Sequence, residues 1–499
     1  MPNAVISVHN KTGLISFANE LKKLGWTIIA SGGTAARLIE NDIDVVKVSD
    51  LTQSPEILGG RVKTLHPAIH GGILARSSQK DKDELNDLGW DYIDLVVVNL
   101  YPFETTVANP DVTLEDAIEN IDIGGVALIR AAAKNFERVT LVCDPNDYTK
   151  IIDELRTGNI NPTTRKKLAI KGFNLTANYD TSIYNYLNQD NSVLQKSYLV
   201  SDLKYGENPH QAAQVYSFDT GSGPLGGKQL HGKELSYNNL LDLDAAWRAI
   251  INFEKPTICI NKHLSPCGIA SSNNLTNAYI AALESDPVSA FGSVVASNKC
   301  IDGETASEMS KLFVECIIAP GFEQNALEIL TKKKNLRLVE MPEVKLRDLD
   351  EFRSINGGFI KQSIDQGDPQ NTKWETVTNR KPTEKELQAL KFAWKACQHV
   401  KSNAIVFVQD EATVGIGGGQ PNRVDCVKIA KQRAGEKSIG AVMASDAFFP
   451  FPDSVEEAAK YGITAIIQPG GSIRDQMSID AANKANISMI FTGVRHFRH

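Results

Sequence analysis

Short apolar runs alternate with stretches of helical spacing along the first part of the chain. Residues 4–8, 27–30 and 45–48 are mostly apolar and rich in β-branched side chains, which predicts buried strands. Between them, residues 13–24 and a stretch that begins at Ala35 have the spacing of amphipathic helices. This alternation predicts a parallel sheet with helices packed against it, and therefore an α/β fold.

Two further apolar runs extend the same domain. Residues 95–98 and 139–143 are nearly continuous apolar segments, and each is followed by a turn that contains proline. Runs without alternation are typical of strands that are buried on both faces. We therefore predict one α/β domain over residues 1–195, with its end marked by the polar stretch 188–192.

The second part of the chain mixes strand-like and helical patterns. A polar stretch at 365–383 separates two segments, which predicts sub-domains over residues 200–370 and 375–499. Residues 383–399 predict a helix, because Thr383 is a suitable N-cap and Glu384 and Glu386 stand in the first turn. The sequence shows no short-period repeat.

A Lys-His pair stands at the end of a predicted strand. Residues 258–261 form a short apolar run, Lys262 and His263 follow it, and residues 266–268 predict a Pro/Gly turn. Ligands of open α/β sheets bind outside the carboxyl ends of strands, so this position is suited to catalysis. A solvated sheet edge is nevertheless the more common explanation of such a pair, so the pair alone does not establish a site.

Composition and charge exclude several classes of protein. A chain of 499 residues is expected to hold about two to four domains. No run approaches the roughly 20 apolar residues that a membrane span requires, and the first residues lack the pattern of an export signal, which predicts a cytoplasmic protein. A formal charge of -7 argues against general nucleic-acid binding, so an anionic ligand must be held by local cations and backbone amides.

The cysteines and histidines do not form a metal-binding pattern. The seven cysteines are scattered and no two have C-x-x-C spacing, so we predict neither a disulfide framework nor a thiolate zinc site. His66 and His70 are spaced like metal ligands on a helix, but Pro67 interrupts such a helix and no Glu-x-x-His partner accompanies them. A structural role for these histidines is the better prediction.

A glycine-containing turn follows the second predicted strand. Its residues are Ser31, Gly32, Gly33 and Thr34. Backbone N–H groups at such a strand-to-helix turn can bind a phosphate, although an ordinary glycine turn explains the motif equally well by itself. The first strand ends near Ser7 and is followed by Lys11, and parallel strands would bring both turns to one edge of the sheet.

The loop 59–67 and the segment 121–134 contain further candidate residues. Arg61, Lys63 and Thr64 place two cations and a hydroxyl in a loop that starts with two glycines. Asp122 precedes Gly124 and Gly125, and Lys134 ends a helical run. Asp122 could simply cap a helix and Lys134 could be surface charge, so these residues alone remain ambiguous.

Several loops of the second part combine glycine, amide and cationic residues. They comprise residues 204–211, 286–292, 401–403 and 415–423. The glycine run lacks the register of a dinucleotide fingerprint and no P-loop is present, so ATP hydrolysis is not predicted. Aromatic residues at 448–451 suit a flat heteroaromatic ligand or, equally, packing at a domain junction. The cationic tail 493–499 suits an anionic ligand or a disordered end.

Taken together, these segments resemble the bifunctional purine-biosynthesis enzymes that combine AICAR transformylase with IMP cyclohydrolase. The motifs GGRVKTLHP at 59–67, KYGENPHQ at 204–211 and KHLSPCG at 262–268 are very specific in this order. The match covers nearly the whole chain and also includes residues 121–125, 130–135, 445–452 and 495–499.

The resemblance implies a methylglyoxal-synthase-like first domain that closes formyl-AICAR to IMP with loss of water. The residues that would bind the nucleotide phosphate are Ser7, Lys11, Ser31, Gly32, Gly33 and Thr34. Those that would surround the base are Arg61, Lys63, Thr64, Asn99, Tyr101, Asp122, Gly124, Gly125 and Lys134. Because a carboxamide nitrogen is a poor nucleophile, the site must stabilise an oxyanion and move amide protons. The implied donors are Lys63, Thr64, Tyr101 and Lys134, and the implied acceptor is Asp122.

For the second part, the resemblance implies two cytidine-deaminase-like α/β sub-domains and formyl transfer from 10-formyltetrahydrofolate to AICAR. His263 would be the general base, Lys262 would stabilise charge on the formyl oxygen, and Asn403 would position the formyl group. The nucleotide would be held by Lys204, Tyr205, Arg423, Arg495 and His499. Folate or the site wall would be contacted by Phe291, Gly292, Phe448 and Asp453.

The chain departs from the family pattern at two places. His9 and Asn10 stand where the family has Ser-Asp, which removes a carboxylate near the phosphate, and Glu315 stands where some relatives have Asp. Glu315 would keep the role of acceptor with one more methylene. Cys267 lacks the second cysteine of the zinc-deaminase motif, so no catalytic metal is implied. In this family the transformylase site is shared across a two-fold dimer, which implies a homodimer.

Two other interpretations stay open at this point. The first domain could be a regulatory nucleotide-binding module joined to an active transformylase, or the chain could be a methylglyoxal synthase with an unrelated second part. A pure sensor needs phosphate ligands but not the base-surrounding set that includes Lys63 and Asp122. The leading interpretation implies AICAR, formyl-AICAR, IMP and a reduced folate as small-molecule partners, with no nucleic acid and no membrane.

Overall fold

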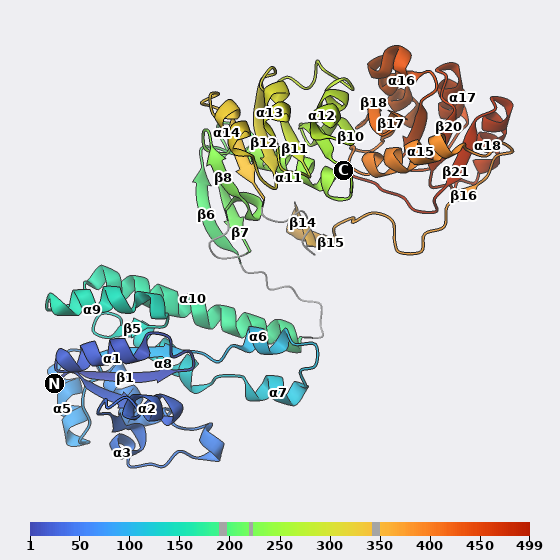
Figure 1. The fold of residues 1–499 in the computed structure, drawn as a ribbon. Helices are drawn as coiled ribbons and strands as arrows, with labels where there is room; N and C mark the ends of the chain where they lie inside the picture. The colour runs from blue at the N-terminus through green and yellow to red at the C-terminus, as the bar shows by residue number, and fades with distance from the viewer. Residues whose placement is uncertain (189–196, 219–222, 342–349) are drawn as a thin grey trace. The chain divides into compact units, whose positions relative to one another are not determined.

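The computed structural model describes residues 1–188, 197–218, 223–341 and 350–499. The chain divides into two compact units, Met1–Lys196 and Ser197–His499 (Figure 1). Beyond residue 188, the polar stretch 188–192 that we predicted as the boundary lies outside the described residues. No helix in the described ranges is long and apolar enough to cross a membrane.

The first unit is built on a parallel five-stranded sheet with the order β3-β2-β1-β4-β5. Its strands are β1 (Asn3–Val8), β2 (Thr27–Ala30), β3 (Val46–Lys47), β4 (Leu95–Asn99) and β5 (Thr140–Val142). Its helices are α1 (Leu14–Lys23), α2 (Gly32–Ile39), α3 (Val48–Thr52), α4 (Pro67–Leu74), α5 (Gln79–Asp87), α6 (Phe103–Val107), α7 (Leu114–Glu119), α8 (Gly124–Lys134), α9 (Tyr148–Arg156) and α10 (Pro162–Leu187). All neighbouring strands pair in parallel, so the predicted parallel sheet is confirmed.

The apolar runs of this unit are buried on both faces of the sheet. In β4, Leu95 and Val97 pack into one hydrophobic cluster, whereas Val96 and Val98 pack into the cluster on the opposite face. The strand order reverses between β1 and β4, and the carboxyl ends of all strands lie at one edge. Such a reversal opens a crevice for a ligand. The turns after β1 and β2, which are predicted to bind a phosphate, start at this edge.

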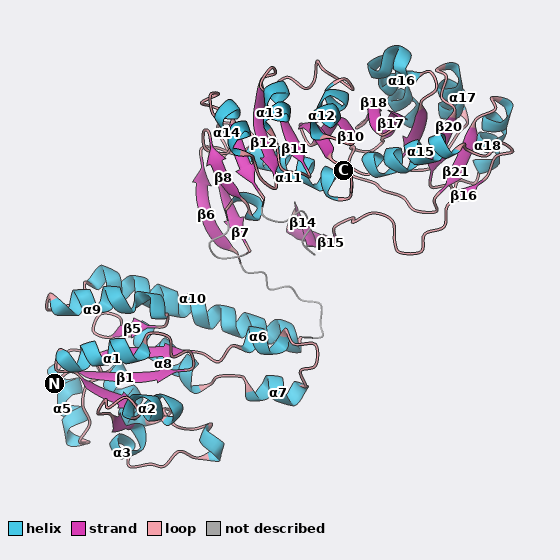
Figure 2. Ribbon diagram, viewed as in Figure 1, coloured by secondary structure: helices cyan, strands magenta, loops and turns pink. Residues whose placement is uncertain are grey.

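The second unit contains a mixed sheet, drawn in magenta in Figure 2. Its twelve described strands have the order β16-β21-β20-β19-β17-β18-β10-β9-β11-β12-β13-β8. These strands are β8 (Lys228–His231), β9 (Thr257–Lys262), β10 (Ser265–Ser271), β11 (Ser293–Ser297), β12 (Val314–Ala319), β13 (Arg337–Glu340), β16 (Glu375–Thr376), β17 (Ile405–Gln409), β18 (Ala412–Gly417), β19 (Val442–Ser445), β20 (Ala465–Gln468) and β21 (Ser488–Phe491). The helices are α11 (Tyr237–Ile251), α12 (Leu275–Leu283), α13 (Gly303–Met309), α14 (Gln324–Leu330), α15 (Glu384–Cys397), α16 (Arg423–Ala434), α17 (Asp453–Lys460) and α18 (Asp475–Lys484). Two separate hairpins pair β6 (Tyr198–Leu203) with β7 (Ala213–Ser217) and β14 (Asp350–Ile355) with β15 (Gly358–Ser363).

The two halves of the large sheet repeat the same topology. The chain order β8-α11-β9-β10-α12-β11-α13-β12-α14-β13 matches β16-α15-β17-β18-α16-β19-α17-β20-α18-β21 element by element. The strand order from the centre to each end also matches, with parallel and antiparallel pairs in the same places. The second unit is therefore a duplicated fold, although the sequence showed no repeat.

One face of the sheet joins the halves and the other keeps them apart. Side chains of α11 and α15 pack into a single cluster that includes strands of both halves, such as Val294 and Val406. On the opposite face, α12 to α14 and α16 to α18 cover separate clusters. The predicted helix over 383–399 is confirmed as α15, with Thr383 and Glu386 forming a capping box.

The halves meet along a seam between the antiparallel strands β10 and β18. Their recorded backbone register is a single pair, Ala270 with Ala412. The Thr413 hydroxyl extends the seam, because its Oγ1 accepts from the N–H of Ile269 at 2.9 Å and bonds the hydroxyl of Ser285 at 3.0 Å. A buried side chain thus makes a hydrogen bond to the backbone at the seam, where the backbone pairing is short.

The predicted turn after Lys262 is placed too far along the chain. The turn consists of His263 and Leu264, with φ of 55° and 64°, and β10 already starts at Ser265. Pro266 is accommodated because the pairing of β9 and β10 shifts register between residues 266 and 268, and proline within a sheet is tolerated at such a bulge.

Two candidate active sites

The first candidate site lies at the carboxyl ends of β1 and β2, where α2 begins. The Nζ of Lys63 lies so close to Gly32 that a Cβ added there would be 3.0 Å from it, and a Cβ on Gly33 would be 4.0 Å from the Nζ of Lys11. Two cations therefore flank the N-terminus of an eight-residue helix, which is a suitable place for an anion. The Glu56 carboxylate, which the sequence analysis did not identify, occupies this place and accepts from the N–H of Gly32 at 3.1 Å.

Thr34, a predicted phosphate ligand, and Asn99, which was predicted to surround the base, hold the turns of this site. The Thr34 hydroxyl is buried and bonds both the N–H and the C=O of Val8, at 3.1 and 3.2 Å. The Asn99 side chain accepts from the N–H groups of His9 and Asn10 at 2.7 and 2.9 Å, across the crevice between β1 and β4. These bonds hold the loop after β1 without the carboxylate that the family has there. Ser7 lies in β1 and Ser31 immediately precedes α2.

The residues predicted to surround the base lie beside the N-termini of two helices, α2 and α8. Lys63 lies at the start of α2, and a Cβ on Gly124, the first residue of α8, would be 3.1 Å from the hydroxyl of the adjacent Thr64. The Asp122 carboxylate accepts from the N–H of Gly125 at 2.7 Å. It therefore caps the first turn of α8, which was the structural alternative to a role in the site. The structure thus brings Lys63, Thr64 and Asp122 into one region with backbone amides of both helices.

Asp122 is electrostatically suited to accept a proton. Burial raises the pKa of its carboxyl above the usual range, although hydrogen bonds from backbone amides oppose that change. Its own N–H donates to the hydroxyl of Tyr179 at 2.8 Å, and that hydroxyl donates to the C=O of Asn120 at 2.9 Å, which fixes the loop before α8. Tyr101 is partly exposed beside this region, and its ring meets the ring of His9 at 5.3 Å between centroids.

Two predicted residues lie apart from this cluster. Lys134 is the last residue of α8, and ten residues of helix place its Cα about 15 Å from that of Gly124. It lines one end of a cavity of about 600 Å³ along α8 and α10 that also reaches Asp122. Arg61 forms an ion pair with Glu119, so its guanidinium already has a carboxylate as partner. The roles of Lys134 and Arg61 beside the base therefore stay predictions.

The second candidate site lies along one edge of the large sheet. Because β17 runs antiparallel to β9, the carboxyl end of β9 and the amino end of β17 share an edge, together with the carboxyl ends of β18, β19 and β21. The amino ends of β11 and β12 lie at the same edge. We call this edge the catalytic edge, after the residues on it that are predicted to be catalytic. Topology thus gathers the following predicted residues there: Lys262, His263, Phe291, Gly292, Glu315, Asn403, Arg423, Phe448, Asp453, Arg495 and His499.

The Lys262-His263 turn is held by a residue that the sequence analysis missed. Asp242 on α11 accepts from the N–H of Leu264 at 2.6 Å and from the Asn261 side chain at 3.2 Å. With the turn fixed at its second residue, Lys262 donates from Nζ to the C=O of Phe291 at 2.7 Å, while His263 is exposed. The His263 ring makes no hydrogen bond within the described ranges, so it is free to act on a ligand.

The residues after α12 form the wall beside Lys262. Phe291 is 59% exposed and packs against Phe313 in a tilted arrangement, at 5.2 Å between ring centroids. Gly292 has a φ of 72°, and its N–H donates to the C=O of Phe313 at 2.8 Å. Glu315 forms an ion pair with Arg337 at 2.6 Å, so its carboxylate already has a cation as partner.

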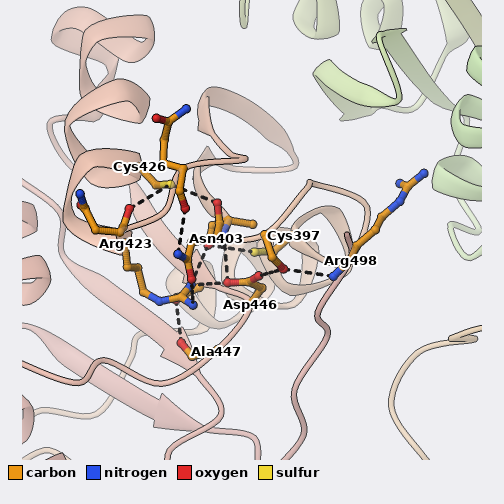
Figure 3. A network of polar contacts seen from close by, with 12 residues as sticks. Cys397, Asn403, Arg423, Cys426, Asp446, Ala447 and Arg498 are labelled. Carbon is orange, nitrogen blue, oxygen red and sulfur yellow. Dashed lines mark hydrogen bonds and ion pairs between the residues drawn. The ribbon is translucent and has the colours of Figure 1, made fainter. Parts of the chain in front are cut away.

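A buried polar network orients Asn403, as Figure 3 shows. The Asp446 carboxylate is fully buried and pairs with the guanidinium of Arg423, whose side chain is 6% exposed. The same guanidinium donates to the side-chain oxygen of Asn403 at 2.6 Å, and the Asn403 amide donates to the C=O of Gln420 at 2.9 Å. Arg423 is thus an orienting residue for Asn403, and its predicted contact with the nucleotide stays a prediction. Asp446 is a further residue that the sequence analysis missed as part of the site.

The KYGENPHQ segment forms the turn of the β6–β7 hairpin. Lys204 is exposed, and its Nζ lies 5.9 Å from the centre of the Tyr205 ring. The C=O of Glu207 accepts from the side chain of Asn238, which is four residues before Asp242 on α11. This turn and the Lys262-His263 turn therefore both contact the start of α11, although no described contact joins them directly.

The aromatic loop after β19 is only partly exposed. Phe448 is 38% exposed, whereas Phe449 is fully buried, so part of the loop packs into the core and the role of Phe448 as a ligand wall stays a prediction. Asp453 begins α17 and is exposed. All seven cysteines are free, and burial raises the pKa of Cys267 to about 12. The described residues include no group of three or more His, Cys, Asp or Glu side chains that could hold a metal ion.

Comparison with known proteins identifies the family. A family model described as "AICARFT/IMPCHase bienzyme" matches residues 132–433, and one described as "MGS-like domain" matches residues 13–127. The first model covers more than half of the chain. The chain belongs to the AICARFT/IMPCHase bienzyme family.

Relatives over the full length agree with this assignment. The "Bifunctional purine biosynthesis protein PurH" of Thermoanaerobacter sp. (strain X514) is 51% identical, over 99% of this chain and 99% of its own. The proteins of the same name from Caldicellulosiruptor saccharolyticus and Bacillus cereus (strain B4264) are 51% and 48% identical with the same coverage. The MGS-like match lies within the parallel-sheet unit, so both the predicted family and the predicted class of the first domain are confirmed. This member of the bienzyme family is an enzyme of purine biosynthesis with transformylase and cyclohydrolase roles.

Proposed function

We propose that the two units divide two consecutive reactions. The unit from residue 197 onward transfers a formyl group from 10-formyltetrahydrofolate to AICAR, and the unit Met1–Lys196 closes the resulting formyl-AICAR to IMP. The observation that supports this division is that each candidate site lies within one unit and has its own titratable groups. Within the second unit, we propose sub-domains over 200–370 and 375–499, which correspond to the two halves of the duplicated sheet.

Formyl transfer requires a base and an oxyanion partner. The AICAR amine attacks the formyl carbon, His263 accepts the amine proton, and the Lys262 ammonium stabilises the negative charge on the formyl oxygen. The intermediate then collapses, and N10 of the folate leaves with a proton. Asn403, held by Arg423, would orient the formyl group before attack. Phe291 and Phe448 are exposed aromatic rings at the same edge and would contact the flat rings of the ligands.

Ring closure requires an acceptor for amide protons. The carboxamide nitrogen attacks the formamide carbon while the Asp122 carboxylate accepts a proton, and the former formyl oxygen leaves as water. The N–H groups at the start of α8 and the Thr64 hydroxyl lie beside Asp122 and would stabilise the oxyanion. The phosphate would replace the Glu56 carboxylate between Lys11 and Lys63 at the start of α2.

An isosteric change at Asp122 tests the cyclohydrolase assignment in the full chain. Asp122→Asn keeps an acceptor for the helix cap but removes the base, so IMP formation from formyl-AICAR should fall about 100-fold or more. In the unchanged chain, cyclisation should decline as pH falls, at a higher pH than an ordinary aspartate would give, because the pKa of Asp122 is raised. A full chain that turns AICAR into formyl-AICAR but never into IMP would favour a regulatory first unit.

We also propose a cytoplasmic homodimer with transformylase sites shared between subunits. The full-length similarity to the bifunctional relatives supports this proposal. Analytical ultracentrifugation of the full chain tests it, since a monomer with full transformylase activity would contradict shared sites.

A further inference from the structure

The last seven residues, 493–499, form a tail that crosses the catalytic edge with two different faces. Arg495, Phe497 and His499 are exposed and contact one another, with the Arg495 guanidinium 4.3 Å from the Phe497 ring centre and the centroids of the tilted Phe497 and His499 rings 5.6 Å apart. His496 and Arg498 alternate with them and point inward, where His496 is 3% exposed. Because the two sets alternate along one segment, the contacts of His496 and Arg498 fix the position of Arg495, Phe497 and His499.

His496 is held by two carboxylates at once. Its Nδ1 lies 2.7 Å from Asp365 and its Nε2 lies 2.9 Å from Asp368. Each ring nitrogen faces a carboxylate oxygen, which accepts hydrogen bonds, so both nitrogens carry protons and the ring is cationic. Two indoles, those of Trp374 and Trp394, donate to Asp368 at 3.1 and 3.0 Å and fix the carboxylate side of the contact.

The same tail is hydrogen-bonded to the segment that precedes Asn403. The Ser402 N–H donates to the C=O of Arg498 at 2.8 Å, and the Arg498 N–H donates to the Ser402 hydroxyl at 3.1 Å. The Arg498 guanidinium donates to the C=O of His399 at 2.7 Å, at the end of α15. The Ser402 hydroxyl in turn donates to Asp446, so tail and buried network share one residue next to Asn403 (Figure 3).

We propose that His496 is a positioning residue for formyl transfer, because its clasp between Asp365 and Asp368 holds the tail that presents Arg495 and braces Ser402-Asn403. Asp365 and Asp368 lie in the segment between the two halves of the duplicated fold, so the clasp ties the end of the chain to its middle. This inference rests on the proposed transformylase role of the second unit.

The clasp is sensitive to pH in one direction. Burial opposes the charged ring, but the bonds to Asp365 and Asp368 raise the pKa of His496 to about 9. His399 and Arg498 are the other titratable groups beside it, and burial lowers the pKa of His399 to about 3, so His399 stays neutral. Burial opposes charge on Asp365 and Asp368 too, but the bonds to His496 lower their pKa values, so both carboxylates stay charged at neutral pH. The clasp is therefore complete at neutral pH and is lost as pH rises through about 9.

The test compares His496→Gln with Glu386→Gln in the full chain. Glu386 forms an ion pair with Arg380 at 2.6 Å at the opposite edge of the same sheet, so its loss is a matched control for general destabilisation. His496→Gln should lower transformylase kcat/KM about 100-fold, mainly through KM for AICAR, while cyclisation of formyl-AICAR by the same preparation is unchanged. Glu386→Gln should lower the melting temperature without changing KM. Equal KM values in both variants and in the unchanged chain would overturn the proposal.

A second variant, Asp365→Asn, tests the clasp if His496→Gln does not fold. Asp365→Asn leaves Asp368 as a partner but removes one cause of the raised pKa, so the pH at which KM for AICAR rises should move from about 9 to a lower value. An unchanged pH profile would contradict the clasp. If the unchanged chain shows no formyl transfer at all, the proposed function fails, and hydrogen exchange at the tail amides against pH still reports whether the clasp holds.

Discussion

At one edge of the large sheet Lys262 is followed by the β9–β10 turn His263-Leu264, and at the other edge Gln409 is followed by the β17–β18 turn Asp410-Glu411. The duplicated topology makes these turns equivalent, since Lys262 pairs with Ser265 as Gln409 pairs with Ala412. His263 and Asp410 even share a positive φ, of 55° and 53°. Backbone geometry alone therefore does not distinguish the two edges.

The edges differ in how their polar groups are satisfied. At the second edge, Glu411 pairs with Lys255 at 2.5 Å, and its C=O accepts from the N–H of Ser271 at 2.9 Å. The hydroxyls of Thr257 and Ser271 bond each other at 2.7 Å. At the catalytic edge the His263 ring is left without a partner in the described chain. A fold that repeats its scaffold can thus confine chemistry to the edge where side chains remain unpaired.

The largest expected effect comes from exchanging the two equivalent turn residues for the same amino acid. Asparagine tolerates a left-handed backbone, so His263→Asn and Asp410→Asn remove each side chain's chemistry without straining the turn. His263→Asn should lower transformylase kcat about 100- to 10,000-fold, and Asp410→Asn should leave it unchanged. Steady-state assays of formyl transfer check this, with cyclisation as the internal control. Similar losses in both variants would mean that the edges are not chemically distinct.

An intermediate effect is expected from breaking the ion pair of each edge. Arg423→Met leaves Asp446 buried without its cation, which should cost about 3–5 kcal/mol of stability in the second unit. Glu411→Gln breaks a partly exposed pair and should cost less than about 1 kcal/mol. Denaturant unfolding of both variants, followed by transformylase activity, measures the difference. A cost for Glu411→Gln as large as that for Arg423→Met would remove the contrast between the edges.

The smallest expected effect comes from two glycines with positive φ. Gly292 lies at the catalytic edge, where a Cβ would be 4.0 Å from the Nζ of Lys262, whereas a Cβ on Gly440 would meet nothing within 4 Å. Alanine at either position should cost about 1–2 kcal/mol for the left-handed conformation. Only Gly292→Ala should also raise the KM of formyl transfer by a few fold, which kinetics at equal temperature would show. A raised KM for Gly440→Ala would point to a global effect of strain.

Local pattern was enough to predict most of the first unit and the position of Lys262. The apolar runs that end near Val8, Ala30 and Asn99 are strands because each has a hydrophobic cluster on both faces. The turn after Lys262 was misplaced because proline was taken as a turn residue, although the bulge in β10 accommodates it.

Tertiary contacts explain what the sequence could not show. Asp242, Glu56 and Asp446 are single acidic residues in ordinary surroundings, and their roles arise only from partners far along the chain. The duplicated topology was implied by the resemblance but not by a repeat in the residues, because equivalent strands need only similar patterns of burial and not similar residues. Lys134 ends the helix that starts at Gly124, and only the tertiary structure shows that a cavity along α8 reaches both Lys134 and Asp122.

The seam between β10 and β18 gives the catalytic edge its span. β9 and β17 are the next strands on either side of it, so Lys262 and Asn403 are carried by different halves. A slip of one residue along the seam would displace one half by about 3.3 Å, whereas productive geometry tolerates about 0.5 Å. The Thr413 hydroxyl, bonded to Ile269 across the seam, therefore helps to fix the register of the two halves, and with it the separation of Lys262 and Asn403.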